Sequence, residues 1–223
     1  MSTSAPQAPS RRGDSVLPAW IKEGGRAVLA PVVRLAMALH LTPNTITVIG
    51  LGITVVASAL VAVDQLLLGA AILTAGSLLD AVDGALARAQ GSGSAFGGFL
   101  DSTLDRAGEA ILFVGVGAWL LRSQEDPTLP VLGLMIALAG SFLVSYTHAR
   151  AQGIGIAANV GLAPRTERLV LMVVGVALAG IGFGIGLVAI IAVLATLTVI
   201  TVVQRIRHVW RLSRAAMPDS KEN

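Results

Sequence analysis

Four aspartates within one short stretch are the residues of this sequence best suited to chemistry. Asp80 and Asp83 are three positions apart and Asp101 and Asp105 are four apart, so on helices each pair would face one way. Apolar segments flank the stretch on both sides. Four carboxylates in a low-dielectric setting cannot all stay ionised without positive charge, and the two arginines of the stretch are too few. The pattern therefore predicts a bound divalent cation.

The donor set predicts the type of cation. All-oxygen ligation favours a hard ion, Mg²⁺ or Mn²⁺, and four acids could hold two ions. The sequence has no cysteine, which excludes thiolate zinc sites and cysteine nucleophiles. Gly84 removes a side chain beside Asp83 and leaves room for a phosphate. Structural ion pairs of the acids with arginine are one alternative interpretation.

A cation transporter is the alternative from another functional class. A transport pathway should carry polar groups to both membrane faces, but the outer halves of the apolar segments are almost purely Ala, Val, Leu, Ile and Gly. The polar groups gather toward one face only. This pattern favours an enzyme that joins a water-soluble reactant to a lipid.

The elements that must position these acids are apolar segments of membrane-spanning length. Of the 223 residues 54% are hydrophobic and 13% charged, which is typical of integral membrane proteins. We expect an all-α protein with six transmembrane helices at about 45–63, 66–86, 97–121, 129–149, 167–183 and 186–204. The last two form one apolar run that "GIGFGIG" at 180–186 divides. We expect a tight turn there, with a re-entrant hairpin as the alternative.

The remaining segments are polar or amphipathic. We expect residues 1–16 to be disordered, 17–40 to form a juxtamembrane amphipathic helix, 41–212 to form the catalytic transmembrane domain, and 213–223 to be a polar tail. Glycines and a proline within 17–40 favour a kink, and packing on the bundle is an alternative to lying on the lipid. Lysine and arginine concentrate on one side of the predicted spans, which predicts that both termini are cytoplasmic in a cell (inner) membrane protein.

A longer motif surrounds the acids: Asp-x-x-Asp-Gly-x-x-Ala-Arg, eight residues, then Gly-x-x-x-Asp-x-x-x-Asp. With it the chain resembles the CDP-alcohol phosphotransferases, and it matches every fixed position of their pattern. The segment "TPNTIT" at 42–47 is similar to that family's Pro-Asn-x-x-Thr segment. The fixed positions are Asp80, Asp83, Gly84, Ala87, Arg88, Gly97, Asp101 and Asp105.

The resemblance implies a fold, a reaction and roles for these residues. The fold is six transmembrane helices around a polar cavity open to the cytosol, in a homodimer. An alcohol attacks the diphosphate of a CDP-linked donor, and CMP leaves. All four aspartates are implied as metal ligands and Asp105 also as the general base. The donor nucleotide is implied to lie against Asn44, Thr47, Gly84, Ala87, Arg88 and Gly97. For Asn44 an N-cap of the first span is an alternative.

A basic stretch at 145–170, "SYTHARAQGIGIAANVGLAPRTERLV", bears on the acceptor. Guanidinium groups bind phosphate well, so we expect an alcohol that carries its own phosphate. The stretch resembles the inositol-phosphate branch of the family, except that His148 replaces that branch's lysine. Plain positive-inside topology is the alternative for these cations. The candidate residues for the acceptor phosphate are His148, Arg150, Arg165, Arg168 and Arg205.

The resemblance also implies the partners. The donor is a CDP-diacylglycerol-type lipid and the acceptor inositol phosphate, with membrane lipids around the chain and no nucleic acid. Glycerol 3-phosphate as acceptor and CDP-archaeol as donor are the alternatives within the same chemistry.

Overall fold

The computed structural model describes residues 34–35, 37–90, 94–162 and 164–215, without the side chains of 78–85 and 87–90. This part of the chain contains six long helices: α2 Pro43–Ala62, α3 Leu66–Gln90, α4 Ala95–Ser123, α5 Thr128–Gly153, α6 Arg165–Gly180 and α7 Gly184–Ala215. Each corresponds to one of the six apolar segments of the sequence. The all-α prediction is therefore confirmed for the described residues.

Three of the helices, α2, α5 and α7, are long and apolar enough to cross a membrane. For α3, the apolar segment Leu66–Ser77 is the continuous part whose side chains are described. Of the other two helices, α4 carries acidic side chains in its first half and α6 has only 16 residues. At 1.5 Å per residue α6 is shorter than a hydrocarbon core of about 30 Å. Six complete spans remain a prediction.

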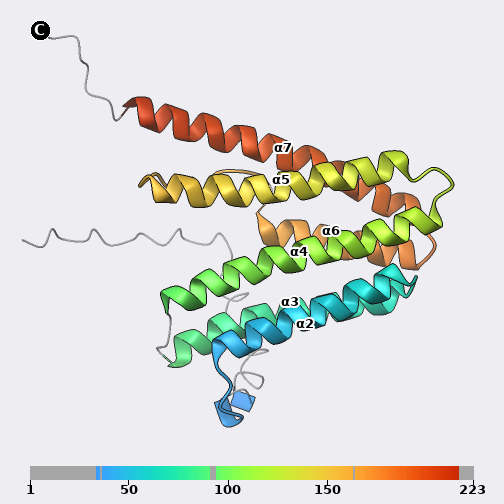
Figure 1. The fold of residues 1–223 in the computed structure, drawn as a ribbon, viewed down its shortest axis with the longest axis horizontal. Helices are drawn as coiled ribbons and strands as arrows, with labels where there is room; N and C mark the ends of the chain where they lie inside the picture. The colour runs from blue at the N-terminus through green and yellow to red at the C-terminus, as the bar shows by residue number, and fades with distance from the viewer. Residues whose placement is uncertain (1–33, 36, 91–93, 163, 216–223) are drawn as a thin grey trace, which may run out of the picture.

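The helices run alongside one another, and their connections gather at the two ends of the bundle (Figure 1). The short α2–α3, α4–α5 and α6–α7 connections share one end. There, the indole nitrogen of Trp119 donates a 2.6 Å hydrogen bond to Asp64. The predicted turn between the last two segments is confirmed, with Gly182 at φ 89°, where a glycine has no Cβ to strain.

The packing forms two groups of helices with a shared core. α2 packs on α3 and α4, α5 packs on α7, and α6 joins the groups by packing on both α7 and α3. Large apolar side chains such as Val114 and Leu129 are exposed on the outside, as expected of a surface that faces lipid. Among the large side chains that are almost fully buried in this core are Val61, Leu112, Val116, Leu120, Met172, Val176, Leu187, Ile191 and Leu194.

The loop between α5 and α6 folds back into the bundle, so α6 begins well inside the ends of α4 and α5 (Figure 1). Contacts with α7 hold it, among them two hydrogen bonds near its end. The Leu162 amide donates to the Thr201 hydroxyl at 3.2 Å, and Nε of Arg205 donates to the Val160 carbonyl at 2.8 Å. Between them Gly161 has φ 135° and faces the Thr201 side chain, so any Cβ would clash. The recessed start of α6 brings its two arginines into the bundle.

Some of the predicted segments lie outside the described residues. The disordered segment 1–16 is entirely outside, and of the amphipathic helix 17–40 only its last residues are described. α7 continues to Ala215, past the predicted domain end at 212, and the rest of the predicted tail is not described.

Candidate active site

The first turns of α4 present a row of acidic side chains. The Ser94 hydroxyl caps the helix by accepting a 2.9 Å hydrogen bond from the Gly97 amide. Asp101, Asp105 and Glu109 then follow at intervals of four, and all three are partly buried. This spacing places them along one face of α4.

The start of α2 lies against the start of α4. A Cβ built on Gly97 would lie 3.2 Å from Oδ1 of Asn44, so these two predicted donor-binding residues are neighbours. Thr47, a third, is 8% exposed, and its hydroxyl donates to the Pro43 carbonyl at 3.1 Å. The structure therefore brings together the described members of that set.

The N-cap alternative for Asn44 is wrong. Thr42 caps α2, because its extended backbone lets the hydroxyl accept from the Thr45 amide at 3.2 Å. Pro43 then occupies the first helical turn, where its missing N–H costs nothing. Asn44 lies inside the helix, and its side chain is available for another role.

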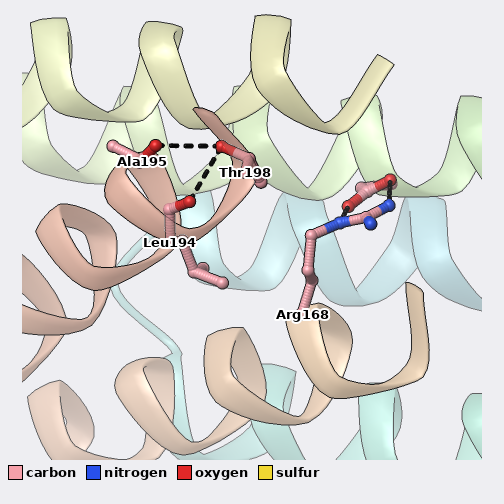
Figure 2. A network of polar contacts seen from close by, with 5 residues as sticks. Arg168, Leu194, Ala195 and Thr198 are labelled. Carbon is pink, nitrogen blue, oxygen red and sulfur yellow. Dashed lines mark hydrogen bonds and ion pairs between the residues drawn. The ribbon is translucent and has the colours of Figure 1, made fainter. Parts of the chain in front are cut away.

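Two ion pairs connect α4 to the start of α6. Asp105 lies 2.9 Å from Arg165, and these side chains are 17% and 35% exposed. One turn deeper, Arg168 makes two hydrogen bonds to Glu109, from Nε to Oε1 at 2.8 Å and from Nη2 to Oε2 at 3.0 Å. Figure 2 shows the Arg168 guanidinium with these two contacts. Arg168 is only 2% exposed and Glu109 11%. Both acids of α4 in these pairs are thus matched by a cation of α6.

A cavity of about 40 Å³ lies between α2, α3, α4 and α6 beside these ion pairs. Asp105, Glu109 and Arg165 supply its charged wall, and Thr47 and Thr54 supply hydroxyls. The volume is enough for a few water molecules. The cavity thus places Asp105 and Arg165 against the same space.

The metal prediction involves both described and undescribed side chains. Asp80, Asp83, Gly84, Ala87 and Arg88 belong to α3, a continuous helix, but their side chains lie outside the described part of the chain. No three His, Cys, Asp or Glu side chains converge on a point among the residues that the structure does describe.

The two described aspartates, Asp101 and Asp105, supply carboxylate oxygens, which suit Mg²⁺ or Mn²⁺. They need the α3 acids to complete a coordination sphere. The four-aspartate centre therefore stays a prediction whose described half fits a hard cation.

The candidates for the acceptor phosphate lie in different surroundings. Arg150 is exposed near the end of α5, and Nδ1 of His148 lies 3.3 Å from the Ala158 carbonyl oxygen. Arg205 donates to the carbonyls of Val160 and Val144, so it supports the loop. Of the five candidates, only Arg165 lines the cavity with Asp105.

Sequence reasoning missed Glu109. It lies four residues after Asp105 and so continues the acidic row of α4 by one turn. This spacing was the available signal. Its partner Arg168 comes 59 residues later in the chain, on α6, which follows Pro164. Nothing local in the sequence pairs Glu109 with Arg168.

Comparison with known proteins places these features in one family. Residues 40–208 match the family described as CDP-alcohol phosphatidyltransferase. The chain is 35% identical over 162 residues to a phosphatidylinositol phosphate synthase of Corynebacterium glutamicum, covering 72% of this chain and 74% of that one. It is 41% identical over 155 residues to an archaetidylinositol phosphate synthase of Pyrococcus horikoshii, covering 69% and 78%.

The fold is also similar to crystal structures of phosphatidylinositol phosphate synthase from Mycobacterium tuberculosis, with 31% sequence identity. The structure with CDP-DAG bound has a TM-score of 0.77 and is covered over 98% of its chain and 88% of this one. The structure in complex with manganese and citrate also has a TM-score of 0.77, with 92% and 87% covered. The match over residues 40–208 and these identities show that this chain is an enzyme of the CDP-alcohol phosphatidyltransferase family.

Proposed function

We propose that the protein transfers a phosphatidyl group from CDP-diacylglycerol to a hydroxyl of inositol phosphate and releases CMP. The observation that carries this proposal is the likeness to the Mycobacterium tuberculosis synthase with CDP-DAG bound, which extends over 98% of that chain. The basic stretch at 145–170 supports an acceptor that carries a phosphate. Family membership favours this activity over cation transport.

The reaction is a substitution at phosphorus. The acceptor oxygen forms a bond to the phosphorus that bears the diacylglycerol, and the bond from that phosphorus to the bridging diphosphate oxygen breaks. CMP leaves with the electron pair of the broken bond. We assign the proton of the attacking hydroxyl to the Asp105 carboxylate, which lies 2.9 Å from the Arg165 guanidinium and lines the cavity.

The donor end of the site is assigned to the α2–α4 contact. Asn44 and Gly97 are neighbours there, and the absence of a Cβ at Gly97 leaves space for a phosphate or ribose next to the Asn44 amide. Thr47 lines the cavity beside Asp105. Gly84, Ala87 and Arg88 belong to this donor set by the family motif.

A divalent ion, Mg²⁺ or Mn²⁺, is assigned to Asp80, Asp83, Asp101 and Asp105, with two ions as the proposed number. When bound, such ions neutralise the diphosphate and the charge that grows on the leaving phosphate. The manganese in the related synthase structure supports this assignment.

We also propose how the chain lies in the membrane. It would form six spans around a cavity open to the cytosol, with both termini cytoplasmic, and act as a homodimer in the cell (inner) membrane.

The acceptor phosphate is assigned primarily to Arg165, with His148, Arg150, Arg168 and Arg205 as the remaining members of the predicted set. Arg165 is about one third exposed and already contacts an oxyanion, the Asp105 carboxylate. A phosphate bound there would place its alcohol next to the proposed base. This geometry connects recognition of the acceptor to its activation.

Two variants of the same chemistry have specific support. The 41% identical Pyrococcus horikoshii relative is an archaetidylinositol phosphate synthase, which supports CDP-archaeol as an alternative donor. His148 in place of a lysine gives one weaker donor at the acceptor site, which supports another phosphate monoester such as glycerol 3-phosphate.

The test is a substrate panel with the purified full chain in detergent. CMP release from CDP-diacylglycerol is measured with inositol phosphate, glycerol 3-phosphate, free inositol or no acceptor. The proposal predicts release that requires inositol phosphate. Release driven by glycerol 3-phosphate and not by inositol phosphate would overturn the acceptor assignment. Release driven equally by free inositol would remove the role of the acceptor phosphate.

A further inference from the structure

The end of α7 carries cations that the proposed reaction does not use. Arg207 and Arg211 are exposed there, and His208 is half-buried. Within the described residues neither of these two guanidinium groups forms an ion pair with a carboxylate. α7 itself contains no Asp or Glu along its length. This end of the helix therefore presents positive charge that its own side chains do not balance.

These cations line a surface pocket of about 400 Å³ between α7 and the loop that precedes α6. Its volume is in the range of small-ligand sites. No acidic side chain is among the residues that line it. His208 also connects the two walls, because its Nε2 lies 3.3 Å from the Ala157 carbonyl oxygen of the loop. The lining residues are Val160, Gly161, Leu162, Gln204, Arg207, His208 and Arg211.

The pocket is separate from the active-site cavity. Arg165 and Asp105 line that cavity and are not among the residues that line this pocket. Arg205 does not line the pocket either, because its guanidinium is directed at carbonyls of the loop and of α5. Successive residues of a helix point about 100° apart, so Gln204 lies on a different face of α7 from its neighbour Arg205. The pocket is thus a second polar site.

The level of the pocket along α7 matches that of lipid headgroups. α7 ends at the end of the bundle opposite the three short connections (Figure 1). At 1.5 Å per residue, Gln204 is about 30 Å from the helix start at Gly184, which is the thickness of a hydrocarbon core. Trp210 is exposed beyond this point, as expected of an indole at a membrane interface.

An apolar surface continues from the pocket toward the middle of α7. Ile200 is 38% exposed and Val203 48%. Phosphate oxygens at the arginines would therefore leave acyl chains in contact with these side chains. Oε1 of Gln204, between the two regions, is buried and accepts no hydrogen bond in the described part of the chain. Four residues at intervals of four, three and four share this face of α7: Ile200, Gln204, Arg207 and Arg211.

We propose that this pocket binds the headgroup of an anionic membrane phospholipid. Arg207 and Arg211 contact its phosphate, because guanidinium groups form charge-assisted hydrogen bonds to phosphate oxygens. The acyl chains lie along Ile200 and Val203. The lipid bound here is a ligand and not a reactant, since the pocket contains neither Asp105 nor the predicted metal ligands.

The test is the binding of phosphatidylglycerol to the purified full chain in detergent, counted lipid by lipid by native mass spectrometry. Phosphatidylglycerol is anionic and is neither donor nor product in the proposed reaction. Phosphatidylcholine, which has no net charge, is the comparison lipid. The variants are Arg207→Gln and Arg211→Gln. Arg214→Gln is the matched control, because Arg214 is exposed on the same helix and lies over the Trp210 ring, 4.9 Å from its centroid, without lining the pocket.

The wild type should bind the first phosphatidylglycerol several-fold more tightly than phosphatidylcholine. Arg207→Gln and Arg211→Gln should each weaken phosphatidylglycerol binding about 5-fold, the value of one arginine at a lipid surface, and leave phosphatidylcholine binding unchanged. Arg214→Gln should have a much smaller effect. All three side chains are exposed, so the variants should fold with nearly the wild-type thermal midpoint Tm.

Equal weakening by Arg214→Gln would overturn the inference, because the attraction would then be spread over the helix end and not located in the pocket. Equal binding of the two lipids by the wild type would also overturn it. Inorganic phosphate and chloride at equal ionic strength should compete equally; stronger competition by phosphate would show a site for the free anion and overturn the lipid assignment. The inference is independent of the proposed function, because the assay contains neither donor nor acceptor.

Discussion

Replacing Asp105 by Asn should separate catalysis from folding. The variant keeps the size of the side chain and removes the carboxylate that we assign as general base. Loss of a positioned base costs about 10²- to 10⁴-fold in rate, equivalent to roughly 3–5 kcal/mol in the activation free energy. We expect kcat for CMP release to fall within that range.

The structure predicts little loss of stability in the same variant. The pair of Asp105 with Arg165 is partly open to solvent, at 17% and 35% exposed. Pairs screened in this way contribute about 0–1 kcal/mol, which is only a few degrees of Tm for a chain of this size. Glu109→Gln makes the same chemical change one helical turn away, in a buried pair, and is expected to cost roughly 3–5 kcal/mol.

The assay is CMP release under saturating donor and acceptor, with Tm measured on the same preparations. Binding of Mn²⁺, measured by electron paramagnetic resonance, checks that the remaining acids still hold metal. The expected result is a large loss of kcat with a nearly unchanged Tm. Wild-type turnover in Asp105→Asn would refute the assigned base, and a Tm loss as large as in Glu109→Gln would refute the argument from burial.

Two further predictions compare glycines in different surroundings. Gly97→Ala should raise the KM for the CDP-linked donor several-fold without affecting the acceptor KM, because its methyl group would lie 3.2 Å from Oδ1 of Asn44. Gly98→Ala is the control, because no atom lies within 4 Å of its Cβ. Equal effects of the two variants on the donor KM would contradict the placement of the donor. Gly161→Ala should lower the free energy of unfolding by about 1–3 kcal/mol, since φ is 135° and the α7 side chain leaves no space, as measured by Tm. Gly153→Ala is the control, because a Cβ there, at the end of α5, would lie in open space. It should lower Tm less than Gly161→Ala does. An equal loss of Tm in the two variants would contradict the argument from the backbone and packing of Gly161.

The helices were predictable because local composition determines them. Each apolar segment is bounded by polar residues or glycines, and the helix ends lie within a few residues of the predicted ones except for α7. α7 continues to Ala215, because its arginine-rich last turns remain helical beyond the length of a span. The turn at Gly182 was predictable because no bilayer accommodates the combined length of α6 and α7.

Contacts between distant segments were not predictable in the same way. The fold-back of the α5–α6 loop depends on Thr201 and Arg205, about 40 residues further along the chain. The sequence predicts Arg205 as a ligand of the acceptor phosphate but did not predict its hydrogen bonds to the carbonyls of Val160 in this loop and Val144 in α5. The pair of Glu109 with Arg168 likewise joins α4 to a helix 59 residues later.

The most direct test of the central claim is the rate of CMP release from CDP-diacylglycerol and inositol phosphate as Mn²⁺ is returned to a fully chelated enzyme. If the aspartates of α3 and α4 hold the ions that neutralise the donor diphosphate, the chelated enzyme is inactive and the rate rises with Mn²⁺ to a plateau. A rate that survives complete chelation would contradict the metal centre.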